Sequence, residues 1–317
     1  MEATFGDDGD LSISAVAQRI EDGISSVVLG KPAQVKLVAA ALLAGEHILL
    51  NDLPGVGKTL LATAVSKVVG GSLGRIQGTP DLLPTDLTGA SIYHQVDDRW
   101  VFRAGPVVAN VALVDEVNRI TPRTQSALLE AMAEGRVTVD GVSRPLPLPF
   151  LVVATMNPVG SMGTFPLVAA QLDRFGLCFG MGSVDRDTER RLLRGAGGPN
   201  AAQELRPVLP VDMLIAAQAA VADVHVSDAL LDYVLDLCDG VRPTGHLSAR
   251  APRALLGTAR AIAVLDRRSF VVPDDIKLLA VPSLAHRLAG EGQPVDTYCP
   301  QVRSVVEDLP VPNVSLR

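Results

Sequence analysis

The stretch that decides the fold is LLNDLPGVGKT, residues 49–59. It predicts an apolar strand that runs through a turn with two glycines, Gly55 and Gly57, into a helix that begins near Lys58. In such a turn, successive backbone N–H groups can point at phosphate oxygens, and the N-terminus of the helix adds its positive dipole end. The stretch therefore predicts a phosphate-binding loop. We expect the nucleotide contacts to come from Pro54, Gly55, Val56, Gly57, Lys58, Thr59 and Leu60.

Two side chains of this loop carry most of the expected chemistry. Lys58 is placed to reach the β and γ phosphates, and the Thr59 hydroxyl to ligate Mg²⁺. The strict pattern asks for glycine five residues before Gly57, where this chain has Asp52. The alternative interpretation, from this motif alone, is an ordinary glycine turn between a strand and a helix.

Polar residues end two further apolar runs. Asp115 and Glu116 close the run that begins at Val111, in the arrangement where the first acid orients a metal's water shell and the second polarises an attacking water. Asn157 follows the run 151–155 and, at the same edge of a parallel sheet, can hold that water near the γ phosphate. Taken alone, the acid pair is more readily a cap on the next helix, and Asn-Pro is a turn signal.

The first two thirds of the chain alternate short apolar runs with helical patterns, which predicts a parallel sheet sandwiched by helices in a three-layer α/β fold. Thr121 and Pro122 mark the start of one helix as N-cap and first helical residue. Expected strands are His47–Asn51, Leu73–Gln77, Val111–Asp115, Leu151–Thr155 and Leu177–Phe179, and expected helices are Val35–Ala44, Thr59–Val69 and Thr121–Glu134. Two hairpins are expected near Ser91–Phe102 and Arg136–Leu146, the second turning at Asp140-Gly141.

After Gly182 the pattern changes to helices only, which predicts a smaller, all-helical second domain. The expected division is 1–24 as an acidic tail and entry helix, 25–183 as the α/β domain and 184–317 as a helical lid. Two domains also agree with the length at roughly 150 residues each. The expected helices are Thr188–Arg194, Val211–Val221, Ser227–Asp239, Arg250–Asp266 and Pro273–Leu288.

Composition narrows the class of protein. Apolar residues make up 48%, charged residues 20% and aromatics 3%, and 28 Lys and Arg against 35 Asp and Glu give a formal net charge of −7, so nucleic acid is not the expected partner. Three cysteines without metal-ligand spacing argue against a disulfide framework and structural zinc. The acidic start lacks signal-peptide features, and no apolar run reaches the ~18 residues of a spanning helix. We expect a cytoplasmic protein without membrane contact.

The order of phosphate loop, strand ending in two acids, strand ending in Asn and helical domain resembles that of the AAA+ ATPases. The residues of many segments are similar to those of the MoxR family. The similar segments run through nearly the whole chain. They are Thr79–Pro84, Phe102–Pro106, Asp115–Arg119, Thr124–Glu130, Asn157-Pro158, Gln171–Phe175, Ala251–Ala254, Pro273–Asp275 and Ala285–Arg287.

The resemblance implies a role for each matching residue. Asp115 is then the metal-orienting Walker B aspartate, Glu116 the general base and Asn157 the first sensor. Arg174 takes the arginine-finger position, acting on a neighbouring subunit's ATP, and Arg253 is the second sensor, touching phosphate of its own chain. Without the family, a surface salt bridge is the commoner role for either arginine, and Arg250 is the nearest rival to Arg253. Adenine contacts are implied for Val28, Leu29 and Gly30.

By the same resemblance, the chain is an ATP-hydrolysing ring motor, hexameric, with ATP and Mg²⁺ as cofactors. It is expected to remodel a client protein complex with a von Willebrand factor A domain protein as partner. The inserted hairpins resemble two inserts that face the ring centre or the client. Two alternatives stay open: a nucleotide-dependent scaffold with negligible turnover, and a DNA-remodelling motor, which the acidic balance disfavours.

Overall fold

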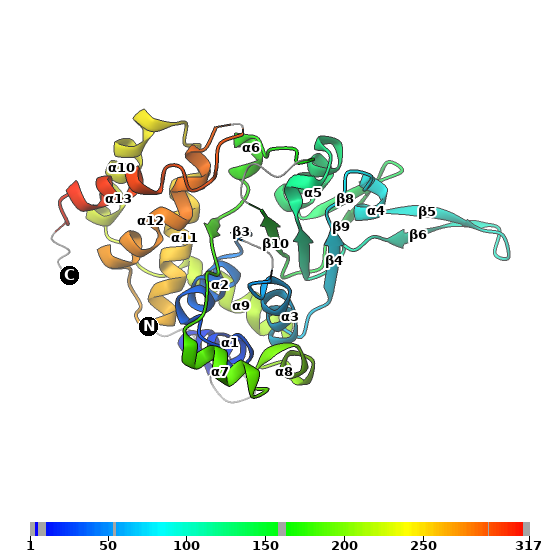
Figure 1. Cartoon of the computed structure of the whole chain (residues 1–317), viewed down its shortest axis with the longest axis horizontal. Helices are drawn as coiled ribbons and strands as arrows, with labels where there is room; N and C mark the ends of the chain where they lie inside the picture. The colour runs from blue at the N-terminus through cyan, green and yellow to red at the C-terminus, as the bar shows by residue number, and fades with distance from the viewer. Residues whose placement is uncertain (1–3, 6–10, 53–54, 158–162, 291, 313–317) are drawn as a thin grey trace.

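The centre of the molecule is a five-stranded parallel sheet, seen in a computed structural model that describes residues 4–5, 11–52, 55–157, 163–290 and 292–312. The strand order is β11-β3-β10-β7-β4, and Figure 1 labels β3, β10 and β4 of these strands. Because β3, β10 and β7 are parallel neighbours, the loops that follow them leave from one edge of the sheet. The strands are β3 (Ile48–Asn51), β4 (Leu73–Gln77), β7 (Val111–Asp115), β10 (Leu151–Met156) and β11 (Leu177–Phe179).

Helices cover both faces of this sheet, which confirms the predicted three-layer fold. Strands buried on both faces need apolar residues at every position, and β7 and β10 are buried throughout. Successive residues of a strand point to opposite faces of the sheet, so Ile48 and Leu50 pack in one hydrophobic cluster and Leu49 packs in the other. The helices are α1 (Ile13–Val27), α2 (Pro32–Ala44), α3 (Lys58–Val68), α4 (Pro84–Thr88), α5 (Pro122–Glu134), α6 (Ala169–Leu172), α7 (Arg186–Leu193), α8 (Gly198–Glu204), α9 (Val211–Ala222), α10 (Asp228–Val241), α11 (Arg250–Leu265), α12 (Pro273–Leu288) and α13 (Cys299–Asp308), with 3₁₀ turns η1 (Val117–Arg119) and η2 (Arg242–Thr244).

Three antiparallel pairs lie outside the main sheet. They are β1 (Thr4–Phe5) with β2 (Leu11–Ser12), β5 (Gly89–His94) with β6 (Arg99–Ala104), and β8 (Arg136–Val139) with β9 (Val142–Pro145). The last two confirm the predicted hairpins, and Asp140 and Gly141 both take positive φ, as a two-residue hairpin turn requires. Figure 1 shows β5 and β6 projecting far from the body of the molecule.

The chain after β11 is helical, as predicted, but its helices pack directly against the helices that cover the sheet. α11 and α9 pack against α2, and α8 packs against α3. One hydrophobic cluster therefore runs from Ile48 in β3 to Leu284 in α12. The division of the chain at residues 24 and 184 stays a prediction, and α1 crosses the first of these points.

The start of α5 differs from the sequence prediction in its hydrogen bonding. Thr121 occupies the N-cap position, but its hydroxyl donates to Thr124 Oγ1 rather than capping a backbone N–H. The sequence patterns did not single out α4, α6, α8 and α13, and the first three of these helices are too short to give a periodic signal. Among the described residues, no helix has both the length and the apolar character needed to cross a membrane.

Candidate functional site

The loop between β3 and α3 has the geometry of an open anion cradle. Gly55 and Gly57 have φ of 89° and 95°, in the left-handed region that favours glycine, and Gly57 directly precedes α3. Nothing lies within 4 Å of the position a Cβ would take on either glycine. The first turn of α3 therefore faces free space at its N-terminus. Pro54, expected in this loop, lies outside the described residues.

Lys58 lies at the base of the cradle. Its side chain is largely buried, with 9% of the residue exposed, and its Nζ donates to the Asp52 backbone carbonyl at 2.9 Å. Burial lowers the pKa of the Lys58 ammonium, and the nearby carboxylates of Asp52, Asp115 and Glu116 oppose that shift. A desolvated ammonium held by a neutral carbonyl is well placed to bind an anion.

A cavity of about 420 Å³ opens next to this loop. It brings together most of the predicted site residues from three separate strands. The predicted residues that line it are Gly55, Gly57, Lys58, Thr59, Leu60, Asp115, Glu116 and Asn157. Sequence reasoning missed four others, Arg75, Gln77, Thr155 and Pro199.

Glu116 and Asn157 are in direct contact. Asn157 Nδ2 donates to Glu116 Oε1 at 3.0 Å, and Arg119 Nη1 donates to Glu116 Oε2 at 3.0 Å. The Glu116 backbone has φ of 57°, and its N–H donates to Thr155 Oγ1 at 2.9 Å, which fixes this strained residue. Asn157 Oδ1 is buried without a hydrogen-bond partner in the described part of the chain. The Glu116 carboxylate lines the cavity, where it can accept a hydrogen bond from a water molecule.

Asp115 is paired with an arginine that the sequence analysis did not single out. Arg75 donates from Nε and Nη2 to Asp115 Oδ2 at 3.2 and 3.1 Å. Arg75 lies on β4, which pairs directly with β7. A charged residue within a predicted strand beside Val111–Asp115 was the available signal, but the strand order was needed to use it.

The residues present fit a magnesium nucleotide. Thr59 and Asp115 line the same cavity as the cradle, and they are the residues that would hold a metal ion there. No group of three or more His, Cys, Asp or Glu side chains suited to a metal exists among the described residues. Mg²⁺ typically uses one or two carboxylates together with substrate phosphates, which matches this donor set.

Arg174 and Arg253 lie away from the phosphate-loop cavity. The described lining of that cavity does not include Arg253, and its expected role as the second sensor stays a prediction. Arg253 lines a second pocket of about 290 Å³ together with Arg174 and Arg250. The reason is the packing of α11 on α2 and α12, which places the N-terminus of α11 beside the loop that carries Arg174.

The second pocket is rich in arginine and only partly neutralised. Neither Arg174 nor Arg253 makes a side-chain hydrogen bond or ion pair to the described part of the chain, whereas Arg250 Nη1 lies 3.7 Å from Asp173 Oδ2. Burial lowers the pKa of Arg174, as does the charge of Arg250. Two unpaired guanidinium groups in one pocket favour an anionic partner from outside the chain.

The predicted adenine segment lies at the end of α1. Val28, Leu29 and Gly30 are not part of the described lining of the phosphate-loop cavity. Gly30 lies instead beside α7, since a Cβ on Gly30 would meet Thr188 Cγ2 at 2.7 Å. Lys31 Nζ donates to the backbone carbonyls of Gly182, at 2.8 Å, and Ser183.

Asp52 has a structural role that explains why it can replace glycine. Its Oδ2 accepts a hydrogen bond from the Gly182 N–H at 2.7 Å. The carboxylate thereby ties the start of the phosphate loop to the same connection that Lys31 holds. A glycine at position 52 has no side chain with which to make this bond.

Comparisons with known proteins agree with this geometry. Residues 47–177 match the model of the ATPase family associated with various cellular activities (AAA), and residues 244–309 match the AAA lid domain. The chain is 44% identical to protein YeaC of Bacillus subtilis, with 84% of each chain covered. It is 38% identical to chaperone MoxR1 of Mycobacterium tuberculosis, with 84% of this chain and 73% of that protein covered.

A solved structure extends the likeness to three dimensions. A crystal structure from Cytophaga hutchinsonii, described as that of a candidate ATPase, superposes with a TM-score of 0.84 at 30% identity. The match covers 95% of this chain and 96% of that one, so both the sheet and the C-terminal helices are shared.

Proposed function

This chain belongs to the MoxR family of AAA+ ATPases, and from that premise we propose that it hydrolyses Mg²⁺-bound ATP at the phosphate-loop cavity. The single observation that carries the proposal is the contact between Asn157 and Glu116 beside the open glycine cradle. It joins a base, a water-orienting amide and a phosphate site in one cavity.

The proposed reaction assigns a role to each side chain. Glu116 accepts a proton from a water molecule held by the Asn157 amide, and the water oxygen bonds to the γ phosphorus. The bond from that phosphorus to the β–γ bridging oxygen breaks, which releases ADP and phosphate. Lys58 and the N–H groups of the cradle stabilise the phosphate charge. Magnesium, held by Thr59 and Asp115, would supply further charge neutralisation.

We propose that both Arg174 and Arg253 act on the ATP of a neighbouring subunit. Three features support this: both are unpaired, both line one pocket, and that pocket is separate from the chain's own phosphate loop. Catalysis that needs arginines from a neighbour requires a head-to-tail ring. By family analogy the ring is a hexamer. Arg253 thus takes a role between chains rather than the same-chain role first expected.

We further propose a chaperone role, in which ATP turnover remodels a client protein complex, with a von Willebrand factor A domain protein as partner. The name of the Mycobacterium tuberculosis relative supports the chaperone role. The projecting hairpin β5–β6 is the candidate client contact, because Trp100, the chain's one tryptophan, is 70% exposed there.

A steady-state assay of Mg²⁺-dependent ATP turnover with Glu116→Gln tests the proposal. The variant keeps the side-chain volume but cannot accept the proton, so we expect turnover to fall by at least about 100-fold while ATP binding persists. Glu307→Gln in α13 is the matched control and should retain full turnover. Equal rates for Glu116→Gln and the unmodified protein would remove Glu116 from its role.

Mixed rings test the arginines separately. Arg174→Ala or Arg253→Ala subunits keep an intact cavity, and Lys58→Ala subunits keep intact arginines. We expect each arginine variant to keep only a low residual turnover alone and to regain activity when mixed with Lys58→Ala, because the intact arginine then meets an intact cavity. Mixed rings that form but regain no turnover would place the arginines in their own chain's site.

A further inference from the structure

Two segments far apart in the sequence are in contact next to Arg174. One is the loop Asp173–Gly176, which carries Arg174, and the other is the α12 segment Ser283–Arg287. We propose that Arg287, together with Ser248, is a positioning residue that fixes the direction of Arg174 toward a neighbouring subunit. The inference rests on the proposed function and adds residues whose hydrogen bonds run to the loop that carries Arg174.

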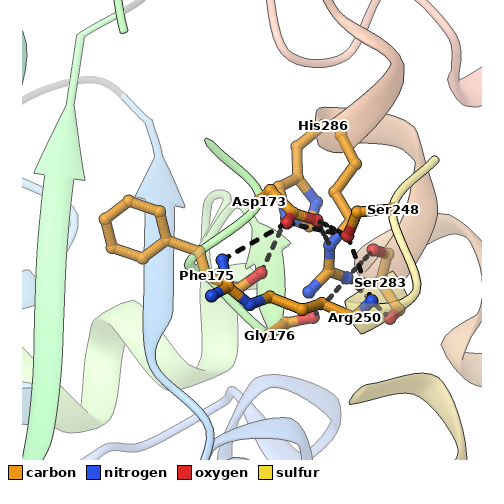
Figure 2. Close-up of polar contacts among 8 residues, drawn as sticks. Asp173, Phe175, Gly176, Ser248, Arg250, Ser283 and His286 are labelled. Atoms are coloured by element: carbon orange, nitrogen blue, oxygen red, sulfur yellow. Dashed lines mark hydrogen bonds and ion pairs between the residues drawn. The ribbon is translucent and has the colours of Figure 1, made fainter. Parts of the chain in front are cut away.

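Asp173 is the centre of the contact. Arg287 Nε donates to Asp173 Oδ1 at 3.2 Å, and Ser248 Oγ lies 2.9 and 2.8 Å from the two carboxylate oxygens. Figure 2 shows Asp173 and Ser248 directed toward each other at the middle of the cluster. The residue just before Arg174 is therefore held by two different parts of the helical region.

The residues just after Arg174 are held as well. His286 Nε2 donates to the Phe175 carbonyl at 2.9 Å, and Arg287 Nη1 donates to the Gly176 carbonyl at 3.4 Å. Arg287 Nη1 is itself fixed by the Ser283 backbone carbonyl and, at 3.2 Å, by the Ser283 hydroxyl. The Phe175 ring points away from this cluster (Figure 2) and is buried in the same hydrophobic cluster as Leu49 of β3. Arg174 is thus flanked on both sides by fixed backbone.

Burial makes the arrangement rigid. Arg287 is 3% exposed, and it packs where the carboxylate of Asp173 is also mostly removed from water. A buried ion pair adds little net stability compared with apolar packing, but removing one partner leaves a costly unpaired charge. The pair therefore serves better to hold one geometry than to stabilise the fold. By contrast, the Arg174 side chain makes no hydrogen bond within the described chain.

The same cluster connects the two arginines of the second pocket. Ser248 Oγ accepts a hydrogen bond from the Arg250 N–H at 3.0 Å, at the start of α11, and Arg253 lies one turn further along that helix. Asp173 thus joins the Arg174 loop to the helix of Arg253. If both guanidinium groups meet one phosphate, their spacing is set here.

Arg287→Lys is the primary test, because lysine keeps the charge but loses the planar fork that reaches Asp173, Gly176 and Ser283 together. We expect ATP turnover to fall about 10- to 100-fold, as for a misplaced catalytic group, with unchanged nucleotide affinity. The double variant Arg174→Ala/Arg287→Lys should be no slower than Arg174→Ala alone. A further loss in the double variant would overturn the inference.

Subunit mixing separates positioning from damage to the fold. Arg287→Lys mixed with Lys58→Ala should regain turnover, since the second subunit supplies a well-placed Arg174. Arg287→Lys mixed with Arg174→Ala should not, and turnover there would contradict the inference. Arg268→Lys is the matched control, because Arg268 pairs with the mostly buried Asp275 in the same helical region and should keep full turnover.

A second variant covers the case in which Arg287→Lys does not fold. Ser248→Ala removes only the hydroxyl that binds Asp173, and we expect a smaller loss of turnover with the same mixing behaviour. Full turnover in a folded Ser248→Ala or Arg287→Lys, when Arg174→Ala keeps only a low residual turnover, refutes the positioning role alone. Full turnover in Arg174→Ala refutes the proposed function on which this inference rests.

Discussion

Replacing Arg75 by glutamine is expected to tighten the binding of Mg²⁺ at the phosphate-loop cavity. Arg75 donates two hydrogen bonds to the carboxylate oxygen Oδ2 of Asp115, the residue proposed to hold the metal's water shell. A metal that needs this carboxylate must compete with the guanidinium. Removing the guanidinium removes that competition, and it also removes one positive charge from the cavity wall.

The expected gain is small because the pair is partly in water. The Arg75 side chain is 57% exposed, and pairs of this kind contribute about 0.2–1 kcal/mol. Converted to an equilibrium constant, that range corresponds to about 1.4- to 5-fold tighter binding of Mg²⁺. The gain should shrink as salt is added, because screening already weakens an exposed pair.

The assay follows binding of a fluorescent, nonhydrolysable ATP analogue while Mg²⁺ is titrated. We expect the half-effective Mg²⁺ concentration to fall in Arg75→Gln and the affinity in EDTA to stay the same. Arg119→Gln is the control, because it removes a cation from Glu116 rather than from Asp115. A half-effective concentration that is unchanged or higher in Arg75→Gln refutes the competition, and weaker binding in EDTA shows that Arg75 binds phosphate instead.

Two further predictions concern the fold around the site. A Cβ on Gly78 would lie 2.2 Å from the Glu116 carbonyl oxygen, so Gly78→Ala should displace the acid pair, lowering turnover at least about tenfold and stability by about 1–3 kcal/mol. Gly257→Ala, in open space on α11, is the control and should be neutral or stabilising. Turnover and urea unfolding are measured for both variants. Burial lowers the pKa of His47 to about 4 and, together with the Arg287 charge, the pKa of His286 to about 3. Both pKa values lie below the ~6.5 of an unfolded histidine, so below that pH the unfolded chain binds more protons than the folded chain. The free energy of unfolding is therefore kept above pH ~6.5 and falls as the pH drops toward 4 for His47 and 3 for His286. Unfolding free energies at pH 7 and 5 should differ by about 2 kcal/mol for each histidine, and His47→Gln should remove that share while His225→Gln, at an exposed position, should not.

Much of the phosphate-loop cavity could be predicted because its motifs are local. The glycines and Lys58 follow one strand within a few residues, and each of the other two strands ends directly in its polar group. A parallel sheet then brings these ends to one edge. Arg75 and Thr155 were missed because they lie inside strands. Only the pairing of β4, β7 and β10 shows which acid each of them contacts.

The second pocket could not be predicted in the same way. Arg253 was placed correctly on a helix, but the direction of α11 depends on its packing against α2, more than 200 residues earlier in the chain. The contact between Asp173 and Arg287 joins residues 114 positions apart. Pairings of this kind follow from how helices pack, and no local spacing encodes them.

The amino-acid sequence was enough to predict the five strands of the main sheet, most of the longer helices, the phosphate loop and the family, because backbone conformation at glycines and hydrophobic periodicity act over a few residues at a time. The tertiary structure alone decided which charges meet: Arg75 with Asp115, Arg287 with Asp173, and Arg253 with Arg174 in a separate pocket. The physical reason is that an ion pair depends on distance in space, and that distance is set only when the apolar faces of remote helices pack together.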